Sequence, residues 1–315
     1  MKLLSVSFNL FKKFFKGYFH ILKKIFFLVS ISYVIYHLYL NINDIKFENN
    51  LQNYNVYISF AFCLSSIIIN GIAYKNIIKW FGESKKINNL IGVYIFTNSL
   101  KYIPGGIWHF IERYNFLKKN IKPKIALYSL LIEPYLMLSS ASLLISFFLF
   151  YNPIYFLFII PTILLNKKLV YYILSRLESL KNNTINIVKV NISRKKFDIE
   201  VNIKTFFPSQ AILIEMIFIL FKFLGFIFCF NIFNQEIYSN IYPIFIIFCL
   251  SWSIGLIIPA APGGIGVFEA CFIFLSRNNY SESALIMSLI YFRIISTLTD
   301  LSLSAPFLWK KYIRR

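Results

Sequence analysis

A proline- and glycine-rich stretch interrupts a long apolar run near the end of the chain. It reads IIPAAPGGIGVFE from Ile257 to Glu269, with Pro259, Pro262, Gly263, Gly264 and Gly266 inside it. Proline removes a backbone donor and glycine makes helix costly, so a helix is expected to break here. At membrane depth such a break survives only inside protein or beside a wet cavity, because lipid offers no hydrogen bonds. In transporters these breaks often form binding sites, with a half-helix N-terminus directed at an anionic group.

The same device occurs earlier in the chain, in KYIPGGIWHFIER from Lys101 to Arg113. Its Pro104, Gly105 and Gly106 correspond to Pro262, Gly263 and Gly264. At the same offset and without a gap, Phe110 aligns with Phe268 and Leu131 with Leu289. This pattern predicts two related halves, about 25–165 and 206–309, each with one broken helix. The alternative is a chance repeat in a biased composition.

The composition is that of an integral membrane protein. Of 315 residues, 58% are hydrophobic and 19% aromatic, which lies far outside the range of soluble domains, and apolar runs long enough to cross a bilayer recur. The formal charge is +20, but the basic residues cluster at the ends of apolar segments, as positive-inside topology requires. Nucleic-acid binding is therefore not expected.

The four cysteines and three histidines lack metal-ligand spacing, and no phosphate-binding G-x-x-x-x-G-K-[ST] stretch occurs. We expect no metal, no cofactor and no ATP hydrolysis by this chain.

An all-α, polytopic membrane bundle with about six to eight crossings is predicted. Residues 1–24 contain frequent lysines and suit a basic amphipathic segment at the interface, whereas 25–309 form one transmembrane domain. The expected apolar segments are 25–40, 54–74, 87–100, 126–151, 154–165, 206–230, 241–258 and 283–308. A basic cytoplasmic loop, 167–205, separates the halves, and 310–315 form a basic cytoplasmic tail.

Both broken segments are expected to be re-entrant hairpins. The helix after the first break, Ile107–Leu117, is too short to span, and basic clusters on both flanks suggest entry from the cytoplasm. The second segment, Ile241 to Leu275, follows a loop without Lys or Arg and so enters from outside. This charge bias predicts an inverted repeat with both termini cytoplasmic. Eight full crossings are the alternative.

The two PGG blocks give the chain a resemblance to a known family. KYIPGGIWHFIER, followed by a span with Glu133, and PAAPGGIGVFE, followed by a span with Arg293, resemble the lysylphosphatidylglycerol synthase transmembrane-region family. This is the flippase-like membrane domain of aminoacyl-phosphatidylglycerol synthases, and the resemblance covers about Leu22 to Lys310. It implies a stand-alone member of the bacterial cytoplasmic membrane that acts on lipids. The synthase domain of the fused enzymes is not expected here, so aminoacyl transfer is not carried over.

The candidate substrate-binding residues surround the two breaks, because charged side chains inside a membrane are costly and mark functional sites by default. The set comprises Lys101, Pro104, Gly105, Gly106, Glu112, Arg113, Glu133, Pro262, Gly263, Gly264, Gly266, Glu269 and Arg293. Lys101, Arg113 and Arg293, with the two half-helix N-termini, could neutralise a lipid phosphate. The competing interpretation is that these are internal ion pairs, for example between Glu269 and Arg293. No catalytic residue is assigned.

The leading functional hypothesis is a flippase-like protein that translocates or handles an anionic phospholipid or a lipid-linked glycan intermediate. Membrane lipids would be its partners, with a glycosyltransferase or another envelope-biosynthesis protein as a further partner. One alternative is an enzyme or enzyme subunit acting on a polyprenyl-phosphate or phospholipid, with Glu112 or Glu133 as general base. The other is a scaffold that recruits a glycosyltransferase through the loop that follows Lys167.

Overall fold

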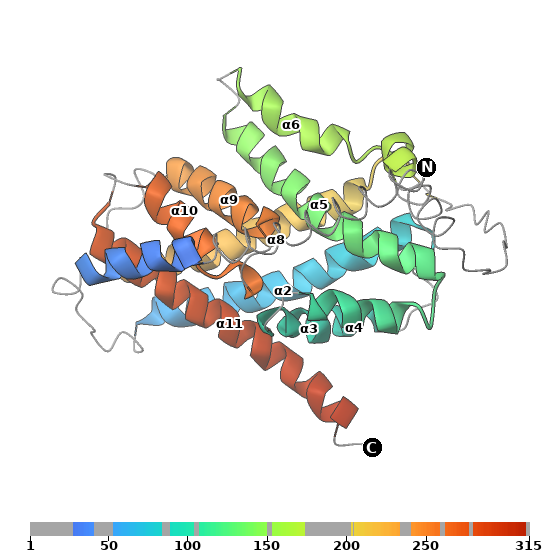
Figure 1. The fold of residues 1–315 in the computed structure, drawn as a ribbon, viewed down its shortest axis with the longest axis horizontal. Coiled ribbons are helices and arrows are strands. Elements are labelled where there is room, and N and C mark those ends of the chain that lie inside the picture. The colour runs from blue at the N-terminus through green and yellow to red at the C-terminus, as the bar shows by residue number, and fades with distance from the viewer. Residues whose placement is uncertain are drawn as a thin grey trace, which may run out of the picture. The chain divides into compact units, whose positions relative to one another are not determined.

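A computed structural model describes ten stretches of the chain: 28–40, 53–83, 89–103, 107–149, 153–173, 203, 205–233, 241–258, 262–276 and 280–312. Throughout these stretches every regular element is a helix (Figure 1), which confirms the prediction of an all-α protein. The predicted interfacial segment 1–24 lies outside the described residues, as do most of the basic loop and the end of the tail.

Among the described residues, four helices are long and apolar enough to cross a membrane. They are α2 (Tyr54–Trp80), α5 (Pro123–Phe148), α8 (Ser209–Phe230) and α11 (Glu282–Tyr312). A fifth candidate is a pair of helices, Phe156–Ile163 and Lys167–Ile173, bent by 67° at the break between them. The finding confirms a polytopic helical bundle, whereas six to eight crossings stay a prediction.

Shorter helices accompany these spans, close to the predicted positions. They are Leu28–Leu40, α3 (Leu90–Asn98) with the 3-10 turn η3 (Ser99–Tyr102), α4 (Trp108–Leu117), α6 (Tyr155–Ile163), α9 (Ile241–Ile257), the 3-10 turn η5 (Pro262–Gly264) and α10 (Val267–Leu275). At 1.5 Å per residue, the nine residues of α10 extend about 14 Å, less than half of a hydrocarbon core of about 30 Å. A helix of nine residues therefore cannot cross the membrane alone.

The structure divides into two compact units that interleave along the sequence. Unit 1 is drawn from Met1–Phe62, Leu100–Trp108 and Phe223–Thr299, and unit 2 from Cys63–Ser99, His109–Lys222 and Asp300–Arg315. Unit 1 thus contains the Leu28–Leu40 helix, α9, η5 and α10, whereas unit 2 contains α3, α5, α6 and nearly all of α4. Helices α2, α8 and α11 contribute residues to both units. The two units are not the predicted halves 25–165 and 206–309, which were inferred from a repeat in the sequence. Those halves stay a prediction.

An aromatic cluster holds unit 1 together. Ring centroids 4.9–6.2 Å apart connect Phe226, Phe248, Phe268, Phe272 and Phe292. These rings come from α8, α9, α10 and α11, and all five are buried. Offset and edge-to-face contacts of this kind add to the burial of apolar area, so the cluster fixes α9 and α10 against the two longer helices.

In unit 2, hydroxyl groups of α5 bind backbone carbonyls of α6. Tyr135 donates to the Pro161 carbonyl at 2.8 Å, and Ser139 donates to the same oxygen at 3.3 Å. Ser142 donates to the Phe158 carbonyl. Small polar residues thus let the two apolar helices approach closely, as is common between membrane helices.

Candidate functional site

The second break forms as the sequence predicts. Helix α9 ends at Ile257, η5 follows at Pro262–Gly264, and α10 begins at Val267. Gly263, Gly264 and Gly266 have φ values of 64°, 72° and 86°. This left-handed region costs residues with a Cβ atom roughly 1–2 kcal/mol, so the path of the backbone favours glycine at these positions.

Helices α9 and α10 pack side by side as a hairpin around this break (Figure 1). A Cβ atom on Gly255 of α9 would lie 3.6 Å from the Cβ of Phe268 on α10. A Cβ on Gly264 would lie 3.3 Å from the Gly255 carbonyl oxygen. The close approach of the two backbones and the positive φ account for the glycine at position 264, whereas a Cβ at Gly255 would make only an ordinary contact.

The N-terminus of α10 is occupied by a carboxylate of the chain itself. Glu269 Oε2 accepts from the Gly266 N–H at 2.7 Å, while Glu269 Oε1 accepts from Arg293 Nε at 2.6 Å. Arg293 Nη2 lies 2.6 Å from the same Oε1, and Nη1 donates to the Gly263 carbonyl at 3.2 Å. The ion pair between Glu269 and Arg293, raised from the sequence as the competing interpretation, is therefore present.

The stretch that precedes the first break meets the second break within unit 1. A Cβ atom on Gly263 would lie 3.2 Å from the Tyr102 ring and 3.9 Å from Lys101 Cγ. The Lys101 ammonium lies over the Tyr102 ring, 5.2 Å from its centroid. The aliphatic part of Lys101 and the guanidinium of Arg293 thus both lie beside Gly263. Pro104, Gly105 and Gly106 lie outside the described residues, so their roles stay predictions.

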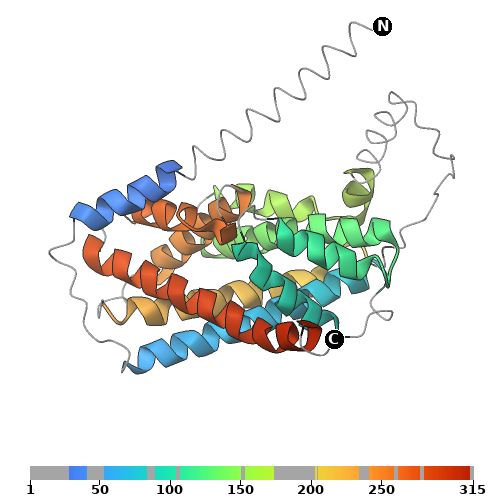
Figure 2. The same ribbon diagram turned by 60° about the horizontal axis from the view of Figure 1, so that its bottom comes forward.

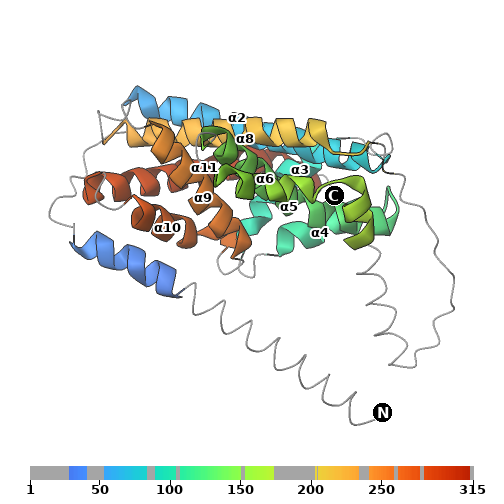
Figure 3. The same cartoon turned by 90° about the horizontal axis from the view of Figure 1, so that it is seen from above.

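The Leu28–Leu40 helix covers the same break from another side. A Cβ on Gly266 would lie 3.0 Å from Ile31 Cγ1 and 3.3 Å from Ser30 Oγ. Figures 2 and 3 show this helix, in blue, running beside α10. Farther along it, His37 Nδ1 lies 3.1 Å from Glu282 Oε2 at the start of α11. The helix is thereby tied to unit 1 at two points.

A second arginine–glutamate pair lies inside unit 2. Arg113 of α4 is fully buried and its Nη1 donates to Glu133 of α5, while its Nε donates to Thr97 of α3 at 3.0 Å. The guanidinium also lies over the Tyr74 and Tyr94 rings, 4.8 and 4.1 Å from their centroids. Stacking on aromatic rings, together with N–H donors that point in different directions, suits arginine inside a protein. Arg113 and Glu133 are therefore engaged with each other.

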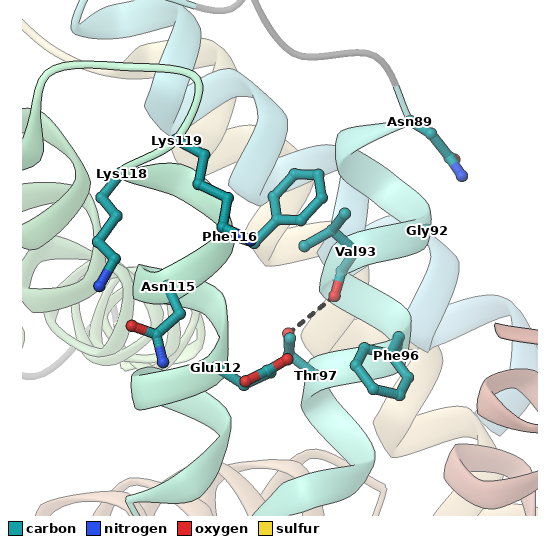
Figure 4. Close-up of a pocket in the computed structure, with 10 residues that line it drawn as sticks. All are labelled: Asn89, Gly92, Val93, Phe96, Thr97, Glu112, Asn115, Phe116, Lys118 and Lys119. Carbon is teal, nitrogen blue, oxygen red and sulfur yellow. Dashed lines mark hydrogen bonds between the residues drawn. The ribbon is translucent and has the colours of Figure 1, made fainter. Parts of the chain in front are cut away.

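The two pairs have a common plan with opposite polarity. In each case a residue of the short helix after a break binds a residue of the next long helix. The short helix supplies Arg113 in the first case and Glu269 in the second, and the long helix supplies Glu133 and Arg293. Glu112, which precedes Arg113, instead lines a groove between α3 and α4 (Figure 4).

Sequence reasoning missed the surroundings of Arg113. Thr97, Tyr74 and Tyr94 were not among the candidates, although each contacts its guanidinium. Thr97 is the single hydroxyl-bearing residue besides a tyrosine in the apolar run LIGVYIFTN. A lone threonine about two turns into such a run was the signal that could have pointed to a buried donor nearby.

A family model for the lysylphosphatidylglycerol synthase TM region matches residues 25–303. The chain belongs to this family. Both PGG blocks, both arginine–glutamate pairs and Lys101 lie within the matched residues, which confirms the resemblance that the two blocks suggested. A search among curated proteins found no match to the chain. As a member of the lysylphosphatidylglycerol synthase TM-region family, the chain is a multi-pass membrane protein related to lipid handling.

Proposed function

We propose that this family member binds the anionic headgroup of a lipid at the second break and translocates that lipid across the membrane. The substrate would be an anionic phospholipid or a lipid-linked glycan intermediate, in the bacterial cytoplasmic membrane. The observation that carries the proposal is that Arg293 binds the Gly263 carbonyl while the Lys101 side chain lies beside the same glycine, in a unit otherwise dominated by aromatic and aliphatic side chains. Intramembrane cations placed at a broken helix mark a path for anions.

The donors at this break are already arranged around an anion. Arg293 and the Gly266 N–H both bind the Glu269 carboxylate, which has oxygens of the same kind and charge as a lipid phosphate. The Arg293 side chain is 22% exposed, against 9% for Glu269, so an anion from outside can reach the guanidinium. A headgroup phosphate would replace Glu269 on Arg293, with Lys101 supplying the second positive charge.

The proposal includes the re-entrant topology. Segments α3–η3–α4 and α9–η5–α10 would each enter and leave on one side, from opposite faces of the membrane, with both chain termini cytoplasmic. Support comes from the shortness of α4 and α10, with 10 and nine residues, and from the close packing of α9 on α10. Movement of such a hairpin would carry the headgroup past the apolar midplane.

The test measures translocation of a fluorescent phosphatidylglycerol in proteoliposomes. A quencher removes the fluorescence of the lipid in the outer leaflet, so the remaining signal reports the lipid in the inner leaflet. We expect Arg293→Ala to abolish translocation because the headgroup phosphate loses its contact with the arginine. We expect Glu269→Gln to abolish it as well, because this variant lacks the carboxylate that would displace the phosphate from Arg293. Lys75→Ala is the matched control, since Lys75 is an exposed cation of α2 in unit 2. Unchanged translocation in both variants would remove the proposed site. A new lipid product in the same vesicles, detected by mass spectrometry, would favour the enzyme hypothesis instead.

A further inference from the structure

Glu215 is a buried carboxyl group in α8, which is the most apolar of the four long helices among the described residues. The residue is 1% exposed. Its neighbours on the same helix face, Ala211, Ile212 and Ile219, are buried and apolar. Helix α5 packs against this part of α8, where Ser140 donates to the Ile212 carbonyl at 3.4 Å. The nearest side chains of its own helix therefore offer Glu215 no hydrogen-bond donor.

Glu215 forms no ion pair with any described residue. Its Oε1 atom is buried and makes no hydrogen bond within the described part of the chain. The ion pairs of the described residues involve the carboxylates of Glu133, Glu269 and Glu282 instead. Lys222, the other charged residue of α8, lies seven residues later, about 10 Å along the helix axis. Burying an ionised carboxylate without a partner is so costly that such a group usually takes up a proton.

The ionisable groups around Glu215 belong to the cluster that contains Arg113 and Glu133. The charge of Glu133 on α5 acts on Glu215, and Tyr94 of α3 interacts electrostatically with both carboxyl groups. Arg113 of α4 and Tyr74 of α2 complete the cluster. It thus contains one arginine and two carboxyl groups, and the arginine is already bound to Glu133. A second ionised carboxylate would place an unbalanced negative charge in a site of low dielectric.

Helix α8 continues from this cluster into the aromatic cluster of unit 1. Its residues up to Lys222 belong to unit 2, and those from Phe223 onward belong to unit 1. Phe226 of α8 contacts Phe272 of α10, with ring centroids 4.9 Å apart. A shift of α8 on proton release would therefore act directly on α10, the short helix whose N-terminus Glu269 caps.

We propose that Glu215 carries a proton in this state of the protein and that exchange of this proton with water drives translocation of the lipid. The proton is taken up from water on one side of the membrane and released to water on the other side, and no other bond changes. Release requires water to reach the buried carboxyl group, so it occurs when α5 and α8 separate. The coupling to lipid rests on the proposed function, whereas the protonation of Glu215 does not.

The protonation of Glu215 is tested by infrared spectroscopy of the full-length protein in non-ionic detergent. A protonated carboxyl group has a C=O stretching band that a carboxylate lacks. We expect the wild type to show this band at neutral pH and Glu215→Gln to lose it. Glu282→Gln is the matched control and should keep the band, since Glu282 is a partly exposed carboxylate bound to His37. A wild type without the band, or a band that persists in Glu215→Gln, would overturn the proton site.

Thermal melting gives a second measure of the same charge state. The glutamine amide has the shape and the neutral charge of a protonated glutamate, so Glu215→Gln should keep the melting temperature of the wild type at neutral pH. Glu133→Gln should lower it, because this variant removes a charge from an existing ion pair. A marked loss of stability in Glu215→Gln would show that the carboxylate is the native form, against the proposal.

The coupling is tested with a fluorescent phosphatidylglycerol tracer in proteoliposomes across a pH gradient, with valinomycin and equal potassium on both sides to hold the membrane potential at zero. If one proton is exchanged per lipid, a gradient of about one pH unit should accumulate the tracer about tenfold in one leaflet. We expect this asymmetry in the wild type and in Lys75→Ala, whereas Glu215→Gln should distribute the tracer equally. An equal distribution in the wild type would overturn the coupling. If the wild type moves no lipid even without a gradient, the proposed function fails, and the infrared band alone decides whether Glu215 binds a proton.

Discussion

Glu269 on α10 and Arg293 on α11 are joined through one carboxylate oxygen, Oε1, which lies 2.6 Å from both Nε and Nη2 of the arginine. The other oxygen, Oε2, accepts from the Gly266 N–H at 2.7 Å. One side chain therefore caps the short helix and ties it to the long helix. In unit 2 the pair of Arg113 and Glu133 joins α4 to α5 in the reverse sense.

Glu269→Ala should lower the melting temperature more than Glu269→Gln. The alanine variant loses the acceptor for Gly266, a contact of the kind worth about 0.5–2 kcal/mol at a helix N-terminus, and leaves Arg293 without its carboxylate. The glutamine amide oxygen can still accept one of these bonds. Thermal unfolding of the detergent-solubilised protein measures the difference. Equal melting temperatures would show that the Gly266 contact contributes nothing.

Arg113→Met should destabilise the protein by about 3–5 kcal/mol, because it leaves Glu133 as a buried charge without its partner. Arg113→Met/Glu133→Met removes both charges and fills the space with apolar atoms, so most of that loss should be recovered. Equilibrium unfolding in mixed micelles gives the free energies. A double variant as unstable as the single one would mean that the pair itself, and not the orphaned charge, sets the stability.

Gly263→Ala should destabilise unit 1 although it adds a single methyl group. The backbone at Gly263 has a φ of 64°, and the new Cβ would lie 3.2 Å from the Tyr102 ring. Gly255→Ala is the matched control, since Gly255 lies in α9 and its nearest atoms would be 3.6 Å away, an ordinary contact. Alanine also favours helix over glycine, so the control should be neutral or more stable. The comparison requires only melting curves, and a Gly263→Ala variant with the stability of the control would refute the strain.

His37→Ala should loosen the Leu28–Leu40 helix. His37 is buried and its Nδ1 lies 3.1 Å from Glu282 Oε2, which ties the helix to the start of α11. Hydrogen exchange followed by mass spectrometry should show faster exchange across this helix in the variant. Tyr39→Ala serves as control because Tyr39 is 73% exposed on the same helix. Unchanged exchange in both variants would show that contacts such as that of Ile31 with Gly266 suffice.

The sequence predicts the apolar helices well because the bilayer imposes a length on them. Four of the predicted segments correspond to α2, α5, α8 and α11. The end of α2 was placed at Tyr74, where the basic residues begin, whereas the helix continues to Trp80. A change in composition marks the edge of the membrane, but a helix can extend past that edge when the residues beyond it still favour helical structure.

The site was predictable in part. The break at Pro262–Gly266 and the pair of Glu269 with Arg293 follow from local composition and from spacing along two consecutive helices. The contact of Tyr102 with Gly263 and the stacking of Arg113 on Tyr74 depend on which distant helices become neighbours. No local pattern encodes such a choice, so these contacts require the fold.

The ion pair of Arg293 with Glu269 limits how strongly any other anion can be bound at this arginine. Since the guanidinium already has a carboxylate partner, an incoming phosphate gains only the difference between two similar ion pairs. Binding would therefore be an exchange, with modest affinity and rapid release, and Glu269 would eject the headgroup by reclaiming its arginine. A carrier benefits from such weak binding, because a lipid that is bound too tightly would not be released on the other side of the membrane.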